Sequence, residues 1–243
     1  MLTHEALISL DGVGLKYRLK RPINGSRDFW ALRDIDLEVR RGETLGIIGN
    51  NGAGKTTLMK LLANIIQEDK GKQIRKPDLK IILLSIGVGF EATLTGRENA
   101  ILSGMLLGLH RRTIEKRLPR IIEFSELGEF IDQPIYTYSS GMNARLGFSV
   151  AMEVNPDVLL LDEVMGVGDM SFSEKSQKVI EEKIKSDMTV ILISHAPEII
   201  QNVCTRATWI HKGVTQTFGS VDEVSTAYSD FMHGKAPLPK PVE

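Results

Sequence analysis

The chain contains the peptide Gly49-Asn50-Asn51-Gly52-Ala53-Gly54-Lys55-Thr56, and this peptide determines the class of fold. It matches in full the pattern G-x-x-x-x-G-K-[ST], whose glycine-rich turn cradles phosphate groups. The apolar run Thr44 to Ile48 precedes it, and Leu58, Leu61 and Leu62 follow it at helical spacing. The peptide therefore lies between a buried strand and a helix, as a phosphate-binding loop requires.

Each residue type in this loop has a chemical reason. Gly49, Gly52 and Gly54 allow unusual backbone dihedral angles and bring backbone N–H groups towards phosphate oxygens. We expect Lys55 to contact the β and γ phosphates as a catalytic residue, and the hydroxyl of Thr56 to coordinate Mg²⁺. The residues predicted to contact the nucleotide here are Gly49, Asn50, Asn51, Gly52, Ala53, Gly54, Lys55, Thr56 and Thr57.

Two acidic residues follow a second apolar run, Val158 to Leu161. Asp162 stands where a carboxylate reaches a metal ion at the carboxyl edge of a parallel sheet, and Glu163 is suited to polarising an attacking water. Such a pair can also be a solvated helix start, but the phosphate loop upstream favours the catalytic interpretation. His195 follows a third run, Thr189 to Ile193, where a histidine is either a structural residue or a sensor of the γ-phosphate.

The remaining pattern predicts an α/β fold with a mostly parallel core sheet, because the later apolar runs do not alternate and so suit strands covered on both faces. Residues 5 to 48 read as β-rich, with short extended segments at 6–10, 14–19 and 35–39. We expect them to form an N-terminal antiparallel β subdomain. Helical spacing between Arg97 and Ile135 indicates a helical insertion, in which Pro119 starts or kinks a helix.

The chain is expected to form a single domain over residues 1–233, with a helical subdomain at about 97–156 and a flexible, Pro-rich tail at 234–243. Its length of 243 residues, with 42% hydrophobic and 25% charged residues, is sufficient for a substantial core. The formal net charge is −1 and Lys and Arg are scattered, which disfavours a nucleic-acid partner.

Membrane insertion and cysteine chemistry are also disfavoured. No apolar run approaches the roughly 18 residues of a membrane span, and the N-terminus has no basic region before an apolar core, so we expect neither a span nor a secretion signal. Cys204 is the only cysteine, which excludes an intrachain disulfide and fits a reducing cytosol. We expect a packed, unreactive thiol.

One further motif, Tyr138-Ser139-Ser140-Gly141-Met142, completes a set of four. With them the chain resembles the ATP-binding subunits of ABC transporters over roughly residues 5 to 225. The phosphate loop matches the Walker A motif, the 138–142 segment stands where the family has its LSGGQ signature, Val158 to Glu163 matches Walker B with the catalytic glutamate, and His195 matches the switch histidine. The signature here lacks its second glycine and ends in Met142 instead of glutamine.

This resemblance implies a site shared between two copies of the chain. Two cassettes close head to tail, and the signature residues Ser139, Ser140 and Gly141 of one copy contact the ATP in the Walker A loop of the other. A hydroxyl and backbone N–H groups at the start of a helix suit that contact. The resemblance also places Asp169 in a loop that crosses the interface between the two cassettes. It places Glu91 near the position of a glutamine that contacts Mg²⁺ in the family. Tyr17 is either the aromatic residue that stacks on adenine or an ordinary strand-packing residue.

Narrower similarities point to a cargo. Gly87 to Phe90, Leu94 to Asn99, the form of the signature and Val167 to Asp169 are similar to subunits that export O-antigen, capsule or teichoic-acid polysaccharides. The resemblance implies an ATPase that converts ATP and water to ADP and phosphate, docks on an integral membrane permease at the cytoplasmic face of the inner membrane, and drives export of lipid-linked polysaccharide, with O-antigen favoured. The alternatives are export of another substrate, or a regulatory ABC ATPase without a permease.

Overall fold

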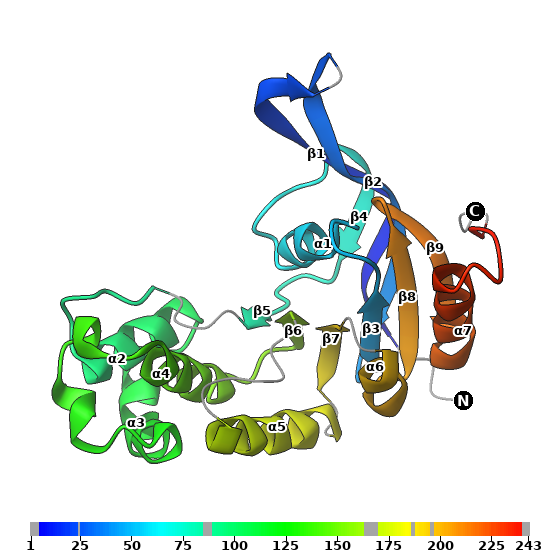
Figure 1. The fold of residues 1–243 in the computed structure, drawn as a ribbon. Coiled ribbons are helices and arrows are strands. Elements are labelled where there is room, and N and C mark those ends of the chain that lie inside the picture. The colour runs from blue at the N-terminus through cyan, green and yellow to red at the C-terminus, as the bar shows by residue number, and fades with distance from the viewer. Residues whose placement is uncertain are drawn as a thin grey trace. The chain divides into compact units, whose positions relative to one another are not determined.

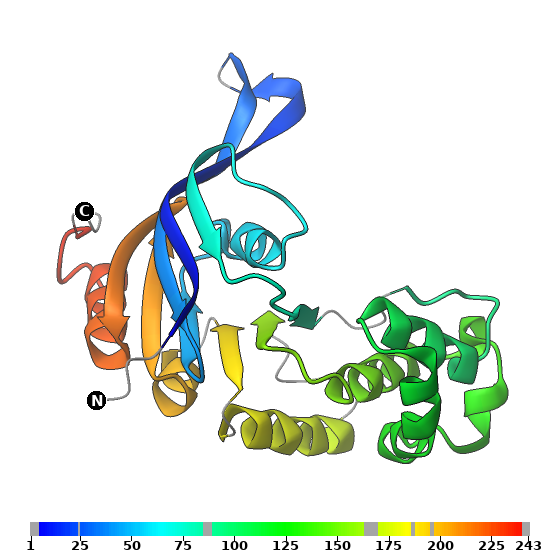
Figure 2. The same cartoon turned by 180° about the vertical axis from the view of Figure 1, so that it is seen from behind.

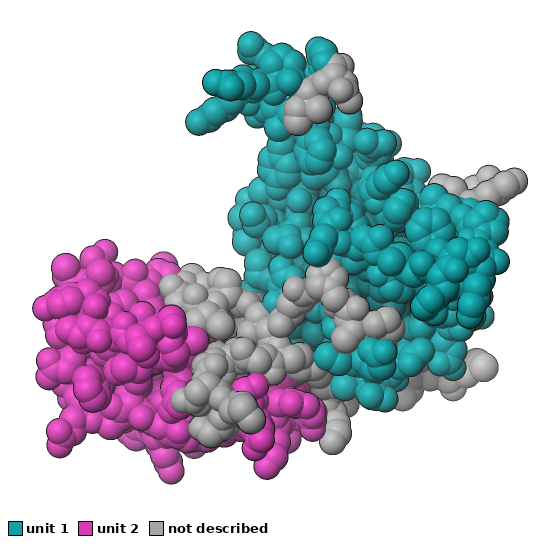
Figure 3. Space-filling view, in the orientation of Figure 1, with its two compact units in different colours: residues 1–83, 157–163, 184–243 teal, residues 84–156, 164–183 magenta. Residues whose placement is uncertain are grey.

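The protein was analysed as a computed structural model, which describes residues 5–23, 25–84, 89–162, 170–185, 188–194 and 197–239. Its contacts divide the chain into two compact units, which Figure 3 draws in different colours. Unit 1 consists of residues 1–83, 157–163 and 184–243, and unit 2 of residues 84–156 and 164–183. Each unit has a hydrophobic core of its own.

Unit 1 is built around a nine-stranded sheet in the order β4-β1-β2-β9-β8-β3-β7-β6-β5, visible from both sides in Figures 1 and 2. The strands are β1 (Ala6–Ile23), β2 (Ser26–Arg40), β3 (Thr44–Ile48), β4 (Lys70–Arg75), β5 (Ile81–Leu84), β6 (Val158–Asp162), β7 (Thr189–Ile193), β8 (Arg206–His211) and β9 (Val214–Ser220). The helices of this unit are α1 (Lys55–Leu62), α6 (Pro197–Val203) and α7 (Val221–Met232), of which α7 packs against β8 and β9.

The centre of the sheet is parallel, as the apolar runs predict. β3 pairs in parallel with β7 and β8, and β6 pairs in parallel with β7. Every residue of β3 and β7 is buried, which explains why their sequences show no alternation. Ile193 of β7 is the register partner of both Ile47 in β3 and Asp162 in β6. The carboxyl ends of β3 and β6 therefore lie at the same edge of the sheet.

The N-terminal strands are antiparallel, with β1 pairing with both β2 and β4. They are longer than the predicted short segments, since 6–10 and 14–19 belong to one strand, β1. The register with β2 shifts between Leu10 and Val13, and Gly12 there has a φ of +56°. The break between the predicted segments 6–10 and 14–19 is therefore a bulge, which shifts the register without ending the pairing. The sequence prediction also missed the short strands β4, β5 and β9.

Unit 2 is helical. It contains α2 (Gly96–Leu106), α3 (Arg111–Ser125), α4 (Ser140–Met152), most of α5 (Met170–Lys185), and the short 3-10 helices η1 (Gly128–Asp132) and η2 (Ile135–Thr137). Its core includes Ile114 and Ile121 of α3 with Leu146 of α4. Pro119 lies inside α3, not at a helix start, and the buried apolar face on either side of it keeps the helix continuous.

Three further observations concern ends and surfaces. In the predicted tail, Lys235 and Ala236 donate backbone hydrogen bonds to the carbonyl of Asp230, and residues 240–243 lie outside the described part of the chain. Burial raises the pKa of the Cys204 thiol to about 12, so the thiol stays protonated at neutral pH. Among the described helices, none combines the length and the apolar character needed to cross a membrane.

Candidate functional site

The predicted phosphate loop leaves the buried strand β3 after Ile48 and enters α1 at Lys55. Two of its glycines are required by close backbone approaches. A Cβ atom on Gly49 would lie 2.3 Å from the carbonyl oxygen of Ile210, and one on Gly54 would lie 2.6 Å from that of Ala31. Gly54 also has a φ of +105°, a conformation that L side chains rarely adopt. Any side chain at either position would displace the loop.

Lys55 lies at the centre of this loop. Its Nζ donates to the backbone carbonyl oxygens of Gly49 at 2.6 Å and Asn50 at 3.1 Å, and the residue is buried. Burial lowers the pKa of Lys55, while the negative charge of Asp162 acts in the opposite direction. The ammonium group is thus held inside the loop, within a partly desolvated setting in which it attracts an anion more strongly than it would in water.

The structure brings together two of the predicted metal ligands, Thr56 at the start of α1 and Asp162 at the end of β6. Thr56 Oγ1 donates to Asp162 Oδ2 at 3.2 Å, although the two residues are 106 positions apart. A hydroxyl and a carboxylate are the hard oxygen donors that Mg²⁺ prefers, with phosphates and water completing its shell. No cluster of three or more His, Cys, Asp or Glu side chains suited to a metal occurs in the described part of the chain. The donor pair fits a magnesium ion shared with a bound nucleotide.

A cavity of about 340 Å³ opens beside these residues. Its lining combines the loop, the hydrogen-bonded pair Thr56 and Asp162, and the β1–β2 hairpin: Tyr17, Phe29, Ala31, Asn51, Gly52, Gly54, Lys55, Thr56, Thr57 and Asp162. Tyr17 and Phe29 are direct cross-strand partners, so their side chains share one face of the hairpin. Both are partly exposed, at 38% and 49%. The cavity therefore offers two aromatic rings, where we predicted only Tyr17.

The sequence analysis missed two residues that line this cavity, Ala31 and Phe29, of which Phe29 is the aromatic one. A signal for it exists in the register of the hairpin, because the residue opposite a stacking tyrosine on the same face lies about 5 Å away. The register depends on where the turn falls, and the predicted extended segments at 14–19 and 35–39 do not include residues 20–34. In the structure β1 runs to Ile23 and β2 begins at Ser26, which pairs with Ile23.

The predicted signature segment lies in unit 2, at the start of α4. Tyr138 is buried, and its hydroxyl donates to the carbonyl oxygen of Phe130 at 2.5 Å. Ser139 is the N-cap of α4, with its Oγ accepting from the backbone N–H of Met142 at 3.1 Å. Both Ser139 and Ser140 are exposed. The segment thus presents a capped helix N-terminus, which favours anions.

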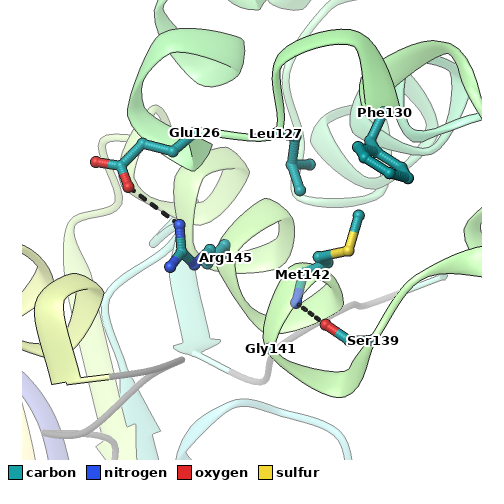
Figure 4. Close-up of a pocket in the computed structure, with 7 residues that line it drawn as sticks. All are labelled: Glu126, Leu127, Phe130, Ser139, Gly141, Met142 and Arg145. Atoms are coloured by element: carbon teal, nitrogen blue, oxygen red, sulfur yellow. Dashed lines mark hydrogen bonds and ion pairs between the residues drawn. The ribbon is translucent and has the colours of Figure 1, made fainter.

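A second cavity, of about 500 Å³, adjoins this helix start (Figure 4). It is lined by Glu126, Leu127, Phe130, Ser139, Gly141, Met142 and Arg145. The guanidinium of Arg145 donates to Glu126 Oε2 at 3.0 Å, and Lys175 donates to the other oxygen of the same carboxylate at 2.8 Å. Lys175 first and Arg145 second hold the pKa of Glu126 below its usual value. One carboxylate of unit 2 therefore contacts two cations of the same unit.

Glu91 belongs to unit 2 and not to the unit that holds Thr56 and Asp162. The buried Asn99 fixes its backbone: the N–H of Glu91 donates to Asn99 Oδ1 at 2.7 Å, and Asn99 Nδ2 donates to the Glu91 carbonyl at 3.0 Å. The carboxylate itself is exposed and accepts from the hydroxyl of Thr93 at 3.2 Å. The structure thus places Glu91 in a defined turn of unit 2.

Three predicted residues, Glu163, Asp169 and His195, lie outside the described residues. For Glu163 and His195 the preceding residue is described. Asp162 is the last residue of β6, and Ser194 directly follows β7, the strand next to β6 in the sheet. Gly87 and Val88 of the subfamily pattern, and Val167 and Gly168, are outside the described residues as well.

Comparison with known proteins identifies similar chains. Residues 32–166 match the family described as ABC transporter. The chain is 44% identical over 206 residues to an O-antigen export system ATP-binding protein of Klebsiella pneumoniae, covering 85% of this chain and 83% of that protein. It is 43% identical over 214 residues to a teichoic acids export ATP-binding protein of Lactococcus lactis subsp. lactis. That match covers 88% of this chain, which spans only 46% of the Lactococcus protein.

Solved structures share the fold. An ATP-binding subunit of an ABC transporter superimposes with a TM-score of 0.72 at 20% sequence identity, covering 94% of both chains. A dimeric ATP-binding cassette in a post-hydrolysis state, bound to ADP and phosphate, superimposes with a TM-score of 0.70 at 20% identity, covering 88% of this chain and 99% of the cassette.

Proposed function

This chain belongs to the ABC transporter family, and from that membership we propose that it is the ATP-hydrolysing subunit of an exporter of lipid-linked polysaccharide. Hydrolysis converts ATP and water to ADP and phosphate. The nucleotide assignment rests on one observation: a single cavity is lined by the phosphate loop, by Thr56 and Asp162, whose side chains are hydrogen-bonded at 3.2 Å, and by two partly exposed aromatic rings. The triphosphate, its magnesium ion and the adenine ring each have a chemically suitable partner there.

The loop would bind the triphosphate through backbone N–H groups at the start of α1 and through Lys55. On binding, the Lys55 ammonium would exchange its contacts with the carbonyls of Gly49 and Asn50 for phosphate oxygens. Thr56 and Asp162 would hold the magnesium ion. When bound, that ion neutralises charge on the phosphates. Tyr17 and Phe29 would receive the adenine ring.

We further propose that Glu163 orients the attacking water and that His195 senses the γ-phosphate. Glu163 directly follows β6, and His195 follows β7 after Ser194, in the parallel sheet whose strand β3 leads into the loop. The signature residues Ser139, Ser140 and Gly141 would act on the nucleotide of a second copy of the chain, and Asp169 would lie at the interface between the two copies. The exposed, capped N-terminus of α4 supports this role. Glu91 is included as a further metal ligand only because it stands near the position of the family's glutamine.

The proposed cargo follows from the named relatives. O-antigen and teichoic acids are both lipid-linked surface polysaccharides, and O-antigen is favoured because the Klebsiella relative is matched over most of its length. Such a subunit would bind a multi-span permease at the cytoplasmic face of the membrane. Deletion of the gene should cause lipid-linked polysaccharide to accumulate inside the cell, and a tagged chain should co-purify with a multi-span protein. Isolation without such a protein would favour the regulatory alternative.

Mixed dimers test the shared site. Alone, the Lys55→Ala chain should be nearly inactive and the Ser139→Ala chain should hydrolyse ATP at least about tenfold more slowly than wild type. When they are mixed, a site that joins two copies gives one site with both lesions and one intact site in each mixed dimer, so ATP hydrolysis should partly recover. If each chain used only its own residues, every site would carry one lesion and no activity would return.

A further inference from the structure

The phosphate loop is anchored from the C-terminal part of unit 1 by a single side chain. The hydroxyl of Tyr228, in α7, donates to Oδ1 of Asn50 at 2.8 Å, across 178 positions of sequence. Asn50 is part of the predicted nucleotide-binding loop, yet it is not among the residues that line the nucleotide cavity. Its side chain is therefore engaged with α7, while its backbone carbonyl contacts Lys55.

The turn between β8 and β9 holds the same loop at a second point. The backbone N–H of Gly213 donates to the carbonyl of Ala53 at 2.9 Å, and the carbonyl of Gly213 accepts from Arg33 at 2.6 Å. A Cβ atom on Gly213 would lie 2.7 Å from the carbonyl oxygen of Ala31. The turn is thus packed between the loop and β2, so the loop rests on the β8–β9 hairpin as well as on α7.

The ring of Tyr228 is itself fixed by aromatic packing. It meets Trp209, a fully buried residue of β8, edge to face with 5.6 Å between ring centroids, and Trp209 also contacts Phe231 of α7 at 5.3 Å. Burial raises the pKa of the Tyr228 hydroxyl, which keeps it protonated and able to donate. The hydroxyl therefore has a defined position relative to the sheet that carries the loop.

We infer that Tyr228 is a positioning residue for the phosphate loop: it holds Asn50 so that the backbone N–H groups of the loop are arranged before the triphosphate binds. This inference rests on the proposed nucleotide-binding function. A loop that is already ordered loses less conformational freedom on binding, so affinity rises without a new contact to the ligand. Tyr228 touches no reacting atom, and its effect is expected in binding and not in the chemical step.

The test is Tyr228→Phe, which keeps the ring in the aromatic cluster and removes only the hydroxyl. A typical intramolecular hydrogen bond contributes enough to predict a roughly three- to tenfold rise in the Kd for MgADP, measured by calorimetry on the purified chain, and a similar rise in the KM for ATP with kcat unchanged. Asn50→Ala should raise the Kd by a similar factor. The double variant should be no weaker than either single variant, because both remove the same interaction.

Ser229→Ala is the matched control, since this neighbouring hydroxyl in α7 contacts His233 and not the loop. It should leave the Kd unchanged. A Tyr228→Phe chain with wild-type Kd, whatever its Tm, would overturn the inference, because a purely structural hydroxyl changes Tm alone. Additive effects in the double variant would also overturn it. Lys55→Ala separates the two claims: if it abolishes MgADP binding while Tyr228→Phe does not weaken it, the proposed function stands and only the positioning role fails.

Discussion

The phosphate loop of unit 1 and the signature segment of unit 2 both present the N-terminus of a helix, but they are built in opposite ways. α1 begins after Gly54, and within the described residues no side chain caps it. A lysine inside the loop supplies the positive charge. α4 begins after Ser139, whose own hydroxyl caps it, and the nearby Arg145 is paired with Glu126.

This difference indicates a division of labour. Uncapped N–H groups together with a partly desolvated ammonium form an anion site that is complete within one unit. A capped helix whose neighbouring cation, Arg145, already contacts a carboxylate should attract a phosphate more weakly, and would suit a role on a nucleotide that another loop holds. Unit 1 should therefore bind nucleotide without help, whereas unit 2 should affect hydrolysis more than binding.

The largest expected effect comes from Lys55→Ala. Removing the one cation of the loop should abolish detectable MgADP binding and lower ATP hydrolysis by about a hundredfold or more, since loss of a single preorganised donor commonly has an effect of that size. Calorimetry and phosphate release measure the two quantities. Lys60→Ala, in the last turn of the same helix and exposed, is the control and should behave as wild type. If Lys55→Ala kept most of its ATP hydrolysis, the proposal that unit 1 alone forms the nucleotide-binding site would be wrong.

Ser139→Ala should have a smaller and more selective effect. ATP hydrolysis by the dimer should fall about tenfold to a hundredfold, equivalent to about 1.4–3 kcal/mol, while the Kd of the isolated chain for MgADP stays unchanged. The variant also loses a helix cap, at a cost of about 1 kcal/mol of stability. Thr95→Ala removes another cap of unit 2, that of α2, and controls for this loss. An equal fall in hydrolysis for both variants would show that only stability had changed.

The sequence predicts the phosphate loop well because the requirements are local. The loop requires a positive φ at Gly54, a lysine directly after it, and an uninterrupted apolar run for β3. All of these lie within about a dozen neighbouring residues. The pairing of Thr56 with Asp162 was also predictable, since parallel strands bring their carboxyl ends to one edge of the sheet. The strand-to-helix context made this part of the site readable without any structure.

The parts that were missed depend on register or on distant contacts. Phe29 enters the cavity only because the β1–β2 turn places it opposite Tyr17, and one residue of slip would turn it to the other face. Tyr228 reaches Asn50 across 178 positions, a separation at which no local pattern carries information. The segment Leu94 to Asn99 was recognised only by its similarity to the export subfamily. The structure gives a steric reason for its glycine, because a Cβ atom on Gly96 would lie 2.2 Å from the hydroxyl of Tyr138.

Gly96→Ala should destabilise the signature side specifically. A Cβ atom there would lie 2.2 Å from the hydroxyl of Tyr138, the residue before Ser139, and 3.1 Å from the carbonyl of Ile131. Overpacking of this kind typically costs about 1–3 kcal/mol of unfolding free energy, which a lower Tm would report. Hydrolysis should fall while MgADP binding by the isolated chain is retained.

Tyr138→Phe in the same chain provides the control for Gly96→Ala. It removes the clashing oxygen, together with that oxygen's hydrogen bond to Phe130. The double variant should therefore recover part of the Tm that the alanine lost. If the double variant were as unstable as the sum of the two single changes, the clash with the hydroxyl would not be the cause.

The smallest expected effect compares one exposed phenylalanine from each unit. Phe29 lines the nucleotide cavity of unit 1 and is 49% exposed, while Phe130 lines the signature cavity of unit 2 and is 54% exposed. Stacking of a base on an aromatic ring contributes about 1–3 kcal/mol, and Tyr17 retains part of it, so Phe29→Ala should raise the Kd for MgADP by about three- to tenfold. Phe130→Ala should leave that Kd unchanged, because single-chain binding uses unit 1 alone. Equal effects of the two substitutions would mean that nucleotide binding is not confined to the loop's own unit, and the division of labour between the two helix starts would then be wrong.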